Sequence, residues 1–139
     1  MQTATRRILV VDDFEPWRRI VCSLLQEQPY LHVVGEAKDG VEAIQKATEL
    51  KPDLVLLEVD LPKTNGLKAA RHIREAAHET KILFLSQIRD TDVIGSALHD
   101  GASGYILKID AGTELLAAIK AILRGENFVS RASERLKPS

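Results

Sequence analysis

The sequence has little of what stabilises or exports small extracellular proteins. Cys22 is the only cysteine in 139 residues, so an intramolecular disulfide is excluded. The apolar run after the first seven residues is too short for the core of a signal peptide, and no later run approaches the length of a membrane span. We therefore expect a cytoplasmic protein without a membrane segment, in which Cys22 is a small buried hydrophobe.

An excess of charge of one sign is also missing. The 19 basic and 20 acidic residues nearly cancel, which leaves no general positive field to attract nucleic acid or an anionic membrane. With 45% hydrophobic residues, a chain of this length can bury a complete core without a metal or disulfides. We expect one compact domain that recognises its partners locally and binds neither nucleic acid nor membrane.

Short apolar runs separated by amphipathic segments indicate alternating strands and helices. The runs are rich in leucine and β-branched residues, which is typical of strands covered on both faces. Between them, Trp17 and Leu24 lie at helical spacing behind Pro16, and Asp39 and Asn65 stand where helix caps are expected. This alternation predicts an α/β protein with a doubly wound, five-stranded parallel sheet. The predicted strands are residues 8–11, 31–34, 54–57, 82–85 and 105–107.

Polar residues stand where four of the predicted strands end. They are Asp12 and Asp13 after the first strand, Glu58 after the third, Ser86 after the fourth and Lys108 after the fifth. Because clustered carboxylates repel one another, their gathering at one edge favours a bound Mg²⁺, with the serine and lysine contacting phosphoryl oxygens. Each acidic residue taken alone is as readily explained as a turn or helix cap. The inference therefore rests on the whole set.

The runs ILVVDD, PDLVLLEVDLPKTNG, ILFLS and GYILK resemble, in this order and spacing, the receiver domains of bacterial two-component response regulators, particularly the NarL/FixJ class. The resemblance covers residues 7–126 and leaves an N-terminal extension (1–6) and a polar C-terminal tail (127–139). It implies a flavodoxin-like (βα)5 fold with strand order 2-1-3-4-5. It also implies a signalling protein of a phosphorelay, which is not an enzyme.

The resemblance further assigns roles and partners. The Mg²⁺ site would consist of Asp12, Asp13 and the backbone carbonyl of Asp60. Ser86 and Lys108 would contact the phosphoryl group, and Ser86 and Tyr105 would form the switch that responds to it. The implied partners are a histidine kinase or phosphotransfer protein upstream and a protein that binds the fourth helix, fifth strand and fifth helix. A homodimer through the first and fifth helices stays open.

Glu58 departs from the family pattern. Pro62 and Gly66 align with the family so that Glu58 occupies the position of the phosphoacceptor aspartate. Its extra methylene displaces the carboxylate by about 1 Å, and a misplacement of that size can cost about 100-fold in a nucleophilic step. Its oxygens would instead imitate a phosphoryl group in part, because a carboxylate has one charge where a phosphoryl group has about −1.5 to −2.

Three functions follow as alternatives. The first is a receiver domain in which Glu58 abolishes or mimics ordinary phosphorylation. The second is a phosphorylation-independent pseudo-receiver that acts as a protein-interaction module. The third, a small enzyme on the same architecture, is disfavoured because DDFEPW, rather than a phosphate-binding glycine loop, follows the first strand. The residues after the fifth helix are too few for a DNA-reading domain, so we expect no direct contact with nucleic acid.

Overall fold

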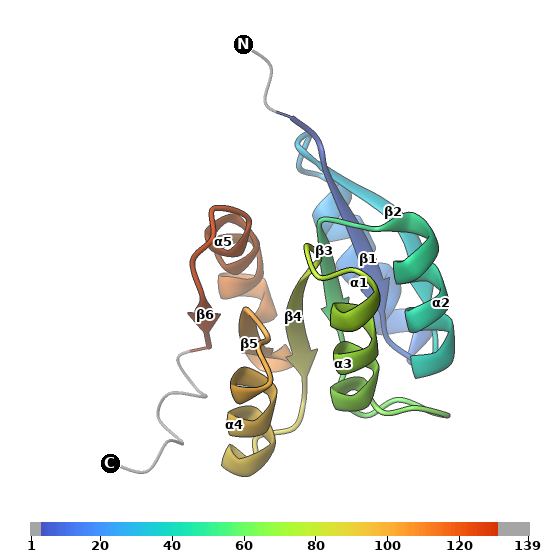
Figure 1. Ribbon diagram of the computed structural model, residues 1–139. Helices are drawn as coiled ribbons and strands as arrows, with labels where there is room; N and C mark the ends of the chain where they lie inside the picture. The colour runs from blue at the N-terminus through green and yellow to red at the C-terminus, as the bar shows by residue number, and fades with distance from the viewer. Residues whose placement is uncertain (1–3, 131–139) are drawn as a thin grey trace.

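The structure, a computed structural model, describes residues 4–130 and contains the predicted alternation of strands and helices (Figure 1). Each of the predicted strands is present, with bounds that differ from the predicted ones by at most a few residues. The strands are β1 (Arg6–Val11), β2 (Leu31–Ala37), β3 (Leu54–Leu57), β4 (Lys81–Ser86) and β5 (Gly104–Leu107). The helices are α1 (Glu15–Gln26), α2 (Gly40–Leu50), α3 (Gly66–Ala76), α4 (Thr91–His99) and α5 (Ala111–Leu123), and the 3₁₀ turn η1 (Lys108–Asp110) precedes α5.

The sheet confirms the predicted class and order. Strand β1 lies between β2 and β3, followed by β4 and β5, and the paired strands run parallel. The carboxyl ends of all these strands therefore lie along one edge of the sheet. The chain leaves β1 towards β2 and then crosses back to β3, so the edge beside β1 and β3 is the switch point of the topology, where ligands of doubly wound folds bind.

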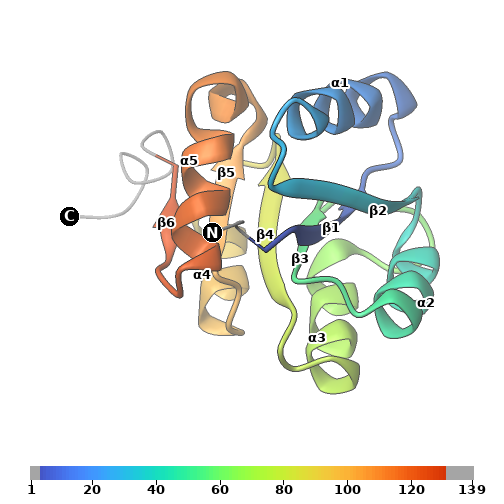
Figure 2. The ribbon, with the colours of Figure 1, turned by 90° about the horizontal axis from the view of Figure 1, so that it is seen from above.

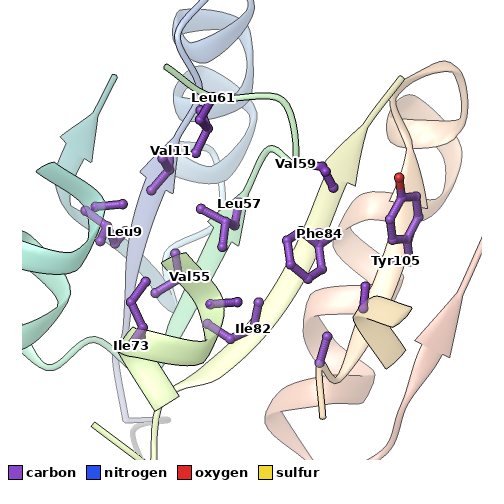
Figure 3. Close-up of a cluster of buried hydrophobic side chains, with 14 of the residues drawn as sticks. Leu9, Val11, Val55, Leu57, Val59, Leu61, Ile73, Ile82, Phe84 and Tyr105 are labelled. Atoms are coloured by element: carbon purple, nitrogen blue, oxygen red, sulfur yellow. The ribbon is translucent and has the colours of Figure 1, made fainter. Parts of the chain in front are cut away.

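Helices cover both faces of the sheet, which explains why the strands are almost continuously apolar. Helices α1 and α5 pack on one face, and α2, α3 and α4 pack on the other (Figure 2). Cys22 is buried in the α1 and α5 layer, as predicted. In the other layer, the ring of Tyr105 lies near that of Phe84 on the neighbouring strand, with ring centroids 6.0 Å apart (Figure 3).

The helix starts follow local sequence signals. Proline occupies the first turn of α1, where a missing N–H costs nothing. The side chain of Asp39 accepts a hydrogen bond from the Glu42 amide, and that of Asn65 accepts one from the Lys68 amide, so both predicted caps form. Among residues 4–130, no helix is both long and apolar enough to cross a membrane.

A sixth strand corrects the predicted five-stranded sheet. Strand β6 (Phe128–Val129) pairs parallel with β5 and gives the order β2-β1-β3-β4-β5-β6 over the described residues. The next residue, Ser130, is fully buried; its amide donates to the Tyr105 carbonyl at 2.8 Å, and its hydroxyl contacts the carboxylates of Asp110 and Glu114. The predicted tail thus begins with a short strand, while its residues 131–139, like residues 1–3, lie outside the described residues.

Candidate functional site

The strand ends bring three of the predicted site residues into direct contact. The ammonium of Lys108, just after β5, lies 2.7 Å from a carboxylate oxygen of Asp12 after β1 and 2.9 Å from one of Glu58 after β3. All three side chains are largely withdrawn from solvent, with 12%, 4% and 7% of the Lys108, Asp12 and Glu58 side chains exposed. Lys108 thus bridges two buried carboxylates across the switch point of the sheet.

The bridge changes the acidity of its lysine. Burial by itself lowers the pKa of Lys108, but the hydrogen bonds that its ammonium donates to Asp12 and Glu58 and the charges of these two carboxylates outweigh burial and raise the pKa above its usual value. Lys108 is therefore positively charged throughout the physiological range. One ammonium thus serves two carboxylate groups.

The second oxygen of Glu58 is held by the backbone. It accepts hydrogen bonds from the amide of Val59 at 2.6 Å and from that of Asp60 at 3.2 Å. Hydrogen bonds to an ionised acceptor are stronger than those between neutral groups. Both oxygens of the Glu58 carboxylate are therefore occupied, one by Lys108 and one by the turn that follows β3.

Helix α3 packs directly under this turn. The Gly66 amide donates to the Val59 carbonyl at 2.6 Å, and a Cβ at position 66 would lie 2.0 Å from the carbonyl oxygen of Glu58. No side chain fits there, so glycine is required for the close approach. The start of α3 thereby fixes the backbone that carries Glu58.

Ser86 belongs to the same edge of the sheet but makes a different contact. Its side chain is fully buried at the end of β4, where its oxygen accepts a hydrogen bond from the Ile88 amide at 3.2 Å. The carbonyl of the same Ile88 accepts a hydrogen bond from the Tyr105 hydroxyl at 2.8 Å. The two predicted switch residues are thus connected through the backbone of one residue, Ile88, in the loop after β4.

Tyr105 is enclosed by the protein. It is fully buried, and burial raises the pKa of its hydroxyl to about 12, with further contributions from the negative charges of Glu58 and Asp90, while the Ser86 side chain acts in the opposite direction. The main cause of the raised pKa is therefore the enclosure of the ring.

The predicted Mg²⁺ ligands are placed less compactly. The Asp12 carboxylate already accepts from Lys108 and from the Phe14 amide, whereas Asp13 and Asp60 are exposed. Among the described residues, no three acidic, histidine or cysteine side chains form a group able to hold a metal. Mg²⁺ needs only one or two carboxylates beside water and a phosphate oxygen, so the oxygen donors fit its chemistry. If Asp12 binds the ion, its carboxylate is shared between the cation and the Lys108 ammonium that already contacts it.

Two contributors to the site were not predicted from the sequence. Trp17, which the sequence pattern places in the core stripe of α1, also lies with its ring centroid 5.5 Å from the Lys108 ammonium. Ile88 takes part through its backbone, which leaves no signal in the sequence. The position of Trp17 in the first turn of α1, directly after the acidic strand end, was the available signal.

Comparison with known proteins identifies the family of the chain. Residues 8–120 match the response regulator receiver domain family. The oxygen regulatory protein NreC of Staphylococcus aureus (strain JH9) is 39% identical over 124 residues, which are 88% of this chain and 57% of that protein. The transcriptional regulatory protein LnrK of Bacillus subtilis is 35% identical over 119 residues, which are 86% of this chain and 54% of that protein. The chain thus spans little more than half the length of these curated relatives.

Solved structures show the same fold. A two-component response regulator of the LuxR family from Aurantimonas is 35% identical, with a TM-score of 0.88 over 96% of this chain and 100% of that chain. The response regulator domain of Thermotoga maritima CheB is 31% identical, with a TM-score of 0.81 over 86% of this chain and 97% of that chain. Sequence and topology agree, and this chain belongs to the response regulator receiver domains of two-component signalling.

Proposed function

We propose that this receiver domain adopts its signalling conformation without phosphorylation, because Glu58 takes the place of the phosphorylated residue. The observation that carries the proposal is the Glu58 carboxylate, which binds the Lys108 ammonium at 2.9 Å and the amides of Val59 and Asp60. By the family resemblance, Lys108 is the residue that contacts the phosphoryl group. Glu58 supplies a permanent negative partner for it.

The position of Tyr105 supports the same proposal. In the family, the switch aromatic moves inward when the domain is phosphorylated, and here Tyr105 is fully buried with its hydroxyl donating to the Ile88 carbonyl. This conformation occurs together with the Glu58–Lys108 pair. An inward Tyr105 together with a carboxylate that binds Lys108 is the arrangement that a phosphorylation-independent switch requires.

The imitation is incomplete in one respect. Glu58 binds Lys108, but the Ser86 oxygen is engaged by the Ile88 amide at 3.2 Å, and a carboxylate has no third oxygen to offer. We therefore expect a signalling level between those of an unphosphorylated and a phosphorylated receiver. The Glu58 side chain sets a bias, which a partner protein can strengthen by binding.

The surface next to this switch is the proposed partner site. It is formed by α4, β5 and α5, and a hollow of about 150 Å³ opens beside Lys108, lined by Gln87, Arg89, Leu107, Lys108 and Ile109. We propose a downstream protein partner at this surface and a histidine kinase or phosphotransfer protein as the upstream one. We propose that the protein acts as a signalling protein and not as an enzyme. We also propose a cytoplasmic location, where a reducing environment keeps Cys22 as a thiol.

A receiver that is still regulated by phosphorylation is the second candidate. It is favoured by the retention of Asp12, Ser86 and Lys108 around the position of the acceptor, with Asp60 nearby. In that case Mg²⁺ would be held by Asp12, Asp13 and the carbonyl of Asp60, and it would supply charge neutralisation for the phosphoryl group. Asp60 is exposed and its amide is bound to Glu58, which turns its backbone rather than its side chain towards the site.

The first experiment treats the protein with acetyl phosphate and Mg²⁺ and follows the intact mass. We expect no added phosphate on the parent protein and one added phosphate on Glu58→Asp, whose shorter side chain restores the nucleophile to the reactive distance. Asp60→Asn in the Glu58→Asp background serves as a control for the site of modification. Stoichiometric phosphate on the parent protein would contradict the proposal.

A second measurement tests the conformational bias. Glu58→Gln keeps the shape of the side chain but removes its charge, so its attraction for Lys108 is lost. We expect amides of β5 and the start of α4 to exchange with deuterium faster in Glu58→Gln than in the parent protein. Equal exchange in the two proteins would show that Glu58 does not hold the switch, even if phosphorylation is absent.

A further inference from the structure

The Lys108 side chain is in contact with a third group besides its two carboxylates. The indole ring of Trp17, on the first turn of α1, lies 5.5 Å from the ammonium, within the range of a cation–π interaction. Trp17 is also the only tryptophan of the chain. The ring packs against the buried layer formed by α1, α5 and the sheet, so its position is set by the core and not by Lys108.

A lysine side chain needs packing partners to fix its position more than most side chains do. Its charge sits at the end of four flexible carbons, and two neighbouring carboxylates attract it without fixing the direction of its stem. Asp12 and Glu58 follow two adjacent strands, β1 and β3, whereas Trp17 belongs to α1. The ring therefore restricts the lysine from a third element of the fold, helix α1.

We propose that Trp17 is a positioning residue, which holds the Lys108 ammonium between Asp12 and Glu58 through the face of its indole ring. Trp17 does not touch the phosphoryl position itself and acts only through Lys108. The role of Trp17 in signalling rests on the proposed function, in which Lys108 binds Glu58 or a phosphoryl group. The ring contact itself stands on the geometry alone.

Helix α1 is anchored at this end, which makes the ring a fixed support. Arg18, the next residue, donates to the carbonyl of Asp12 at 2.7 Å and pairs with Glu36 at 2.9 Å. The start of α1 is thereby tied to the backbone that carries the Asp12 carboxylate. Lys108 thus contacts a carboxylate and a ring whose backbones are linked by Arg18.

The chain contains a matched control for this contact. Lys120 lies over the ring of Tyr30 at 5.6 Å, and both Trp17 and Tyr30 have a buried polar atom without a hydrogen-bond partner among the described residues. Both rings pack against the same buried layer. Tyr30→Leu therefore removes an aromatic of similar surroundings and leaves the Lys108 site untouched.

The direct test is the NMR spectrum of the Lys108 side chain in the full chain. Protons above an aromatic face are shifted upfield, so the Lys108 Hε resonances should move downfield in Trp17→Leu, remain partly shifted in Trp17→Phe and stay unchanged in Tyr30→Leu. If Trp17→Leu does not fold, Trp17→Met, which fills the space without a ring, takes its place. Unchanged Lys108 resonances in the ring-free variant would overturn the proposal.

The functional test uses the Glu58→Asp background with acetyl phosphate. Loss of the ring should slow phosphate incorporation by about 2- to 30-fold, the range expected for a cation–π contact, with Phe intermediate and Tyr30→Leu without effect. Equal slowing by Tyr30→Leu would show that Trp17 acts only through core packing and would contradict the proposal. The outcome is independent of whether the parent protein is phosphorylated, so failure of this inference and of the proposed function are distinguishable.

Discussion

The Tyr105 hydroxyl donates a hydrogen bond to the carbonyl of Ile88 at 2.8 Å, and the amide of the same residue donates to Ser86. The loop after β4 is therefore held at one residue by both members of the predicted switch. A displacement of Ser86 would pull on the residue whose carbonyl binds Tyr105. The connection is short, consists of hydrogen bonds and is shielded from solvent at both side chains.

The first prediction concerns the acidity of Tyr105. Because its folded pKa of about 12 lies above the value of about 10 for an unfolded tyrosine, its neutral form stabilises the fold fully below pH 10, and this contribution is lost as the pH rises towards 12. Phenolate absorbance measured against pH, as the difference between the parent protein and Tyr105→Phe, should show a step near pH 12. A step near pH 10 would mean that Tyr105 is accessible to water.

The second prediction concerns the ammonium bridge. Lys108→Met leaves the buried carboxylates of Asp12 and Glu58 facing each other without a cation, which should lower the free energy of unfolding by about 3 kcal/mol. Urea unfolding at neutral pH measures this loss. Lys68→Met, on an exposed position of α3, is the control and should change the free energy of unfolding by about 0.5 kcal/mol or less.

The Glu58→Gln background separates the two possible reasons for this loss. Removing one of the two charges removes their mutual repulsion, so the destabilisation by Lys108→Met should be smaller in Glu58→Gln than in the parent protein. A difference that persists unchanged would point to lost packing of the lysine stem rather than to charge.

The third prediction concerns the glycine beneath Glu58. Gly66→Ala places a Cβ 2.0 Å from the Glu58 carbonyl oxygen, so the turn or α3 must move, at a cost of about 3 kcal/mol or more. Gly95→Ala in α4 is the matched control: nothing lies within 4 Å of its Cβ, and it should stabilise the protein by about 0.5–1 kcal/mol. Thermal unfolding of both variants checks the contrast, which fails if they shift the melting temperature in the same direction.

Most of the fold was predictable because its signals are local. The runs that became β3 and β5 are apolar throughout, and the caps Asp39 and Asn65 are recognisable from their own neighbours. Strand β6 was missed because two residues carry no periodicity. Its place depends on pairing with β5, where Gly104 allows the approach, since a Cβ there would lie 2.3 Å from the Phe128 carbonyl oxygen.

The sequence predicted which residues share the edge of the sheet, but it did not predict the contacts between their side chains. Parallel strands place Asp12, Glu58 and Lys108 at one edge whatever their rotamers, and this follows from the order of elements. The contact of one ammonium with both carboxylates depends on side-chain packing, which the order of elements does not specify. The exposure of Asp13 and Asp60 has a simpler reason, because each lies beyond the buried acidic residue in the turn that leaves its strand.

The central place of β1 has a consequence for how the chain can fold. Asp12 is made early in synthesis, but its partner Lys108 follows β5, and every strand pairing of the described sheet is parallel and joins segments distant in sequence. Such contacts form late and slowly. During synthesis, the Asp12 and Glu58 carboxylates therefore have no ammonium partner at this site until Lys108, which follows β5, has left the ribosome.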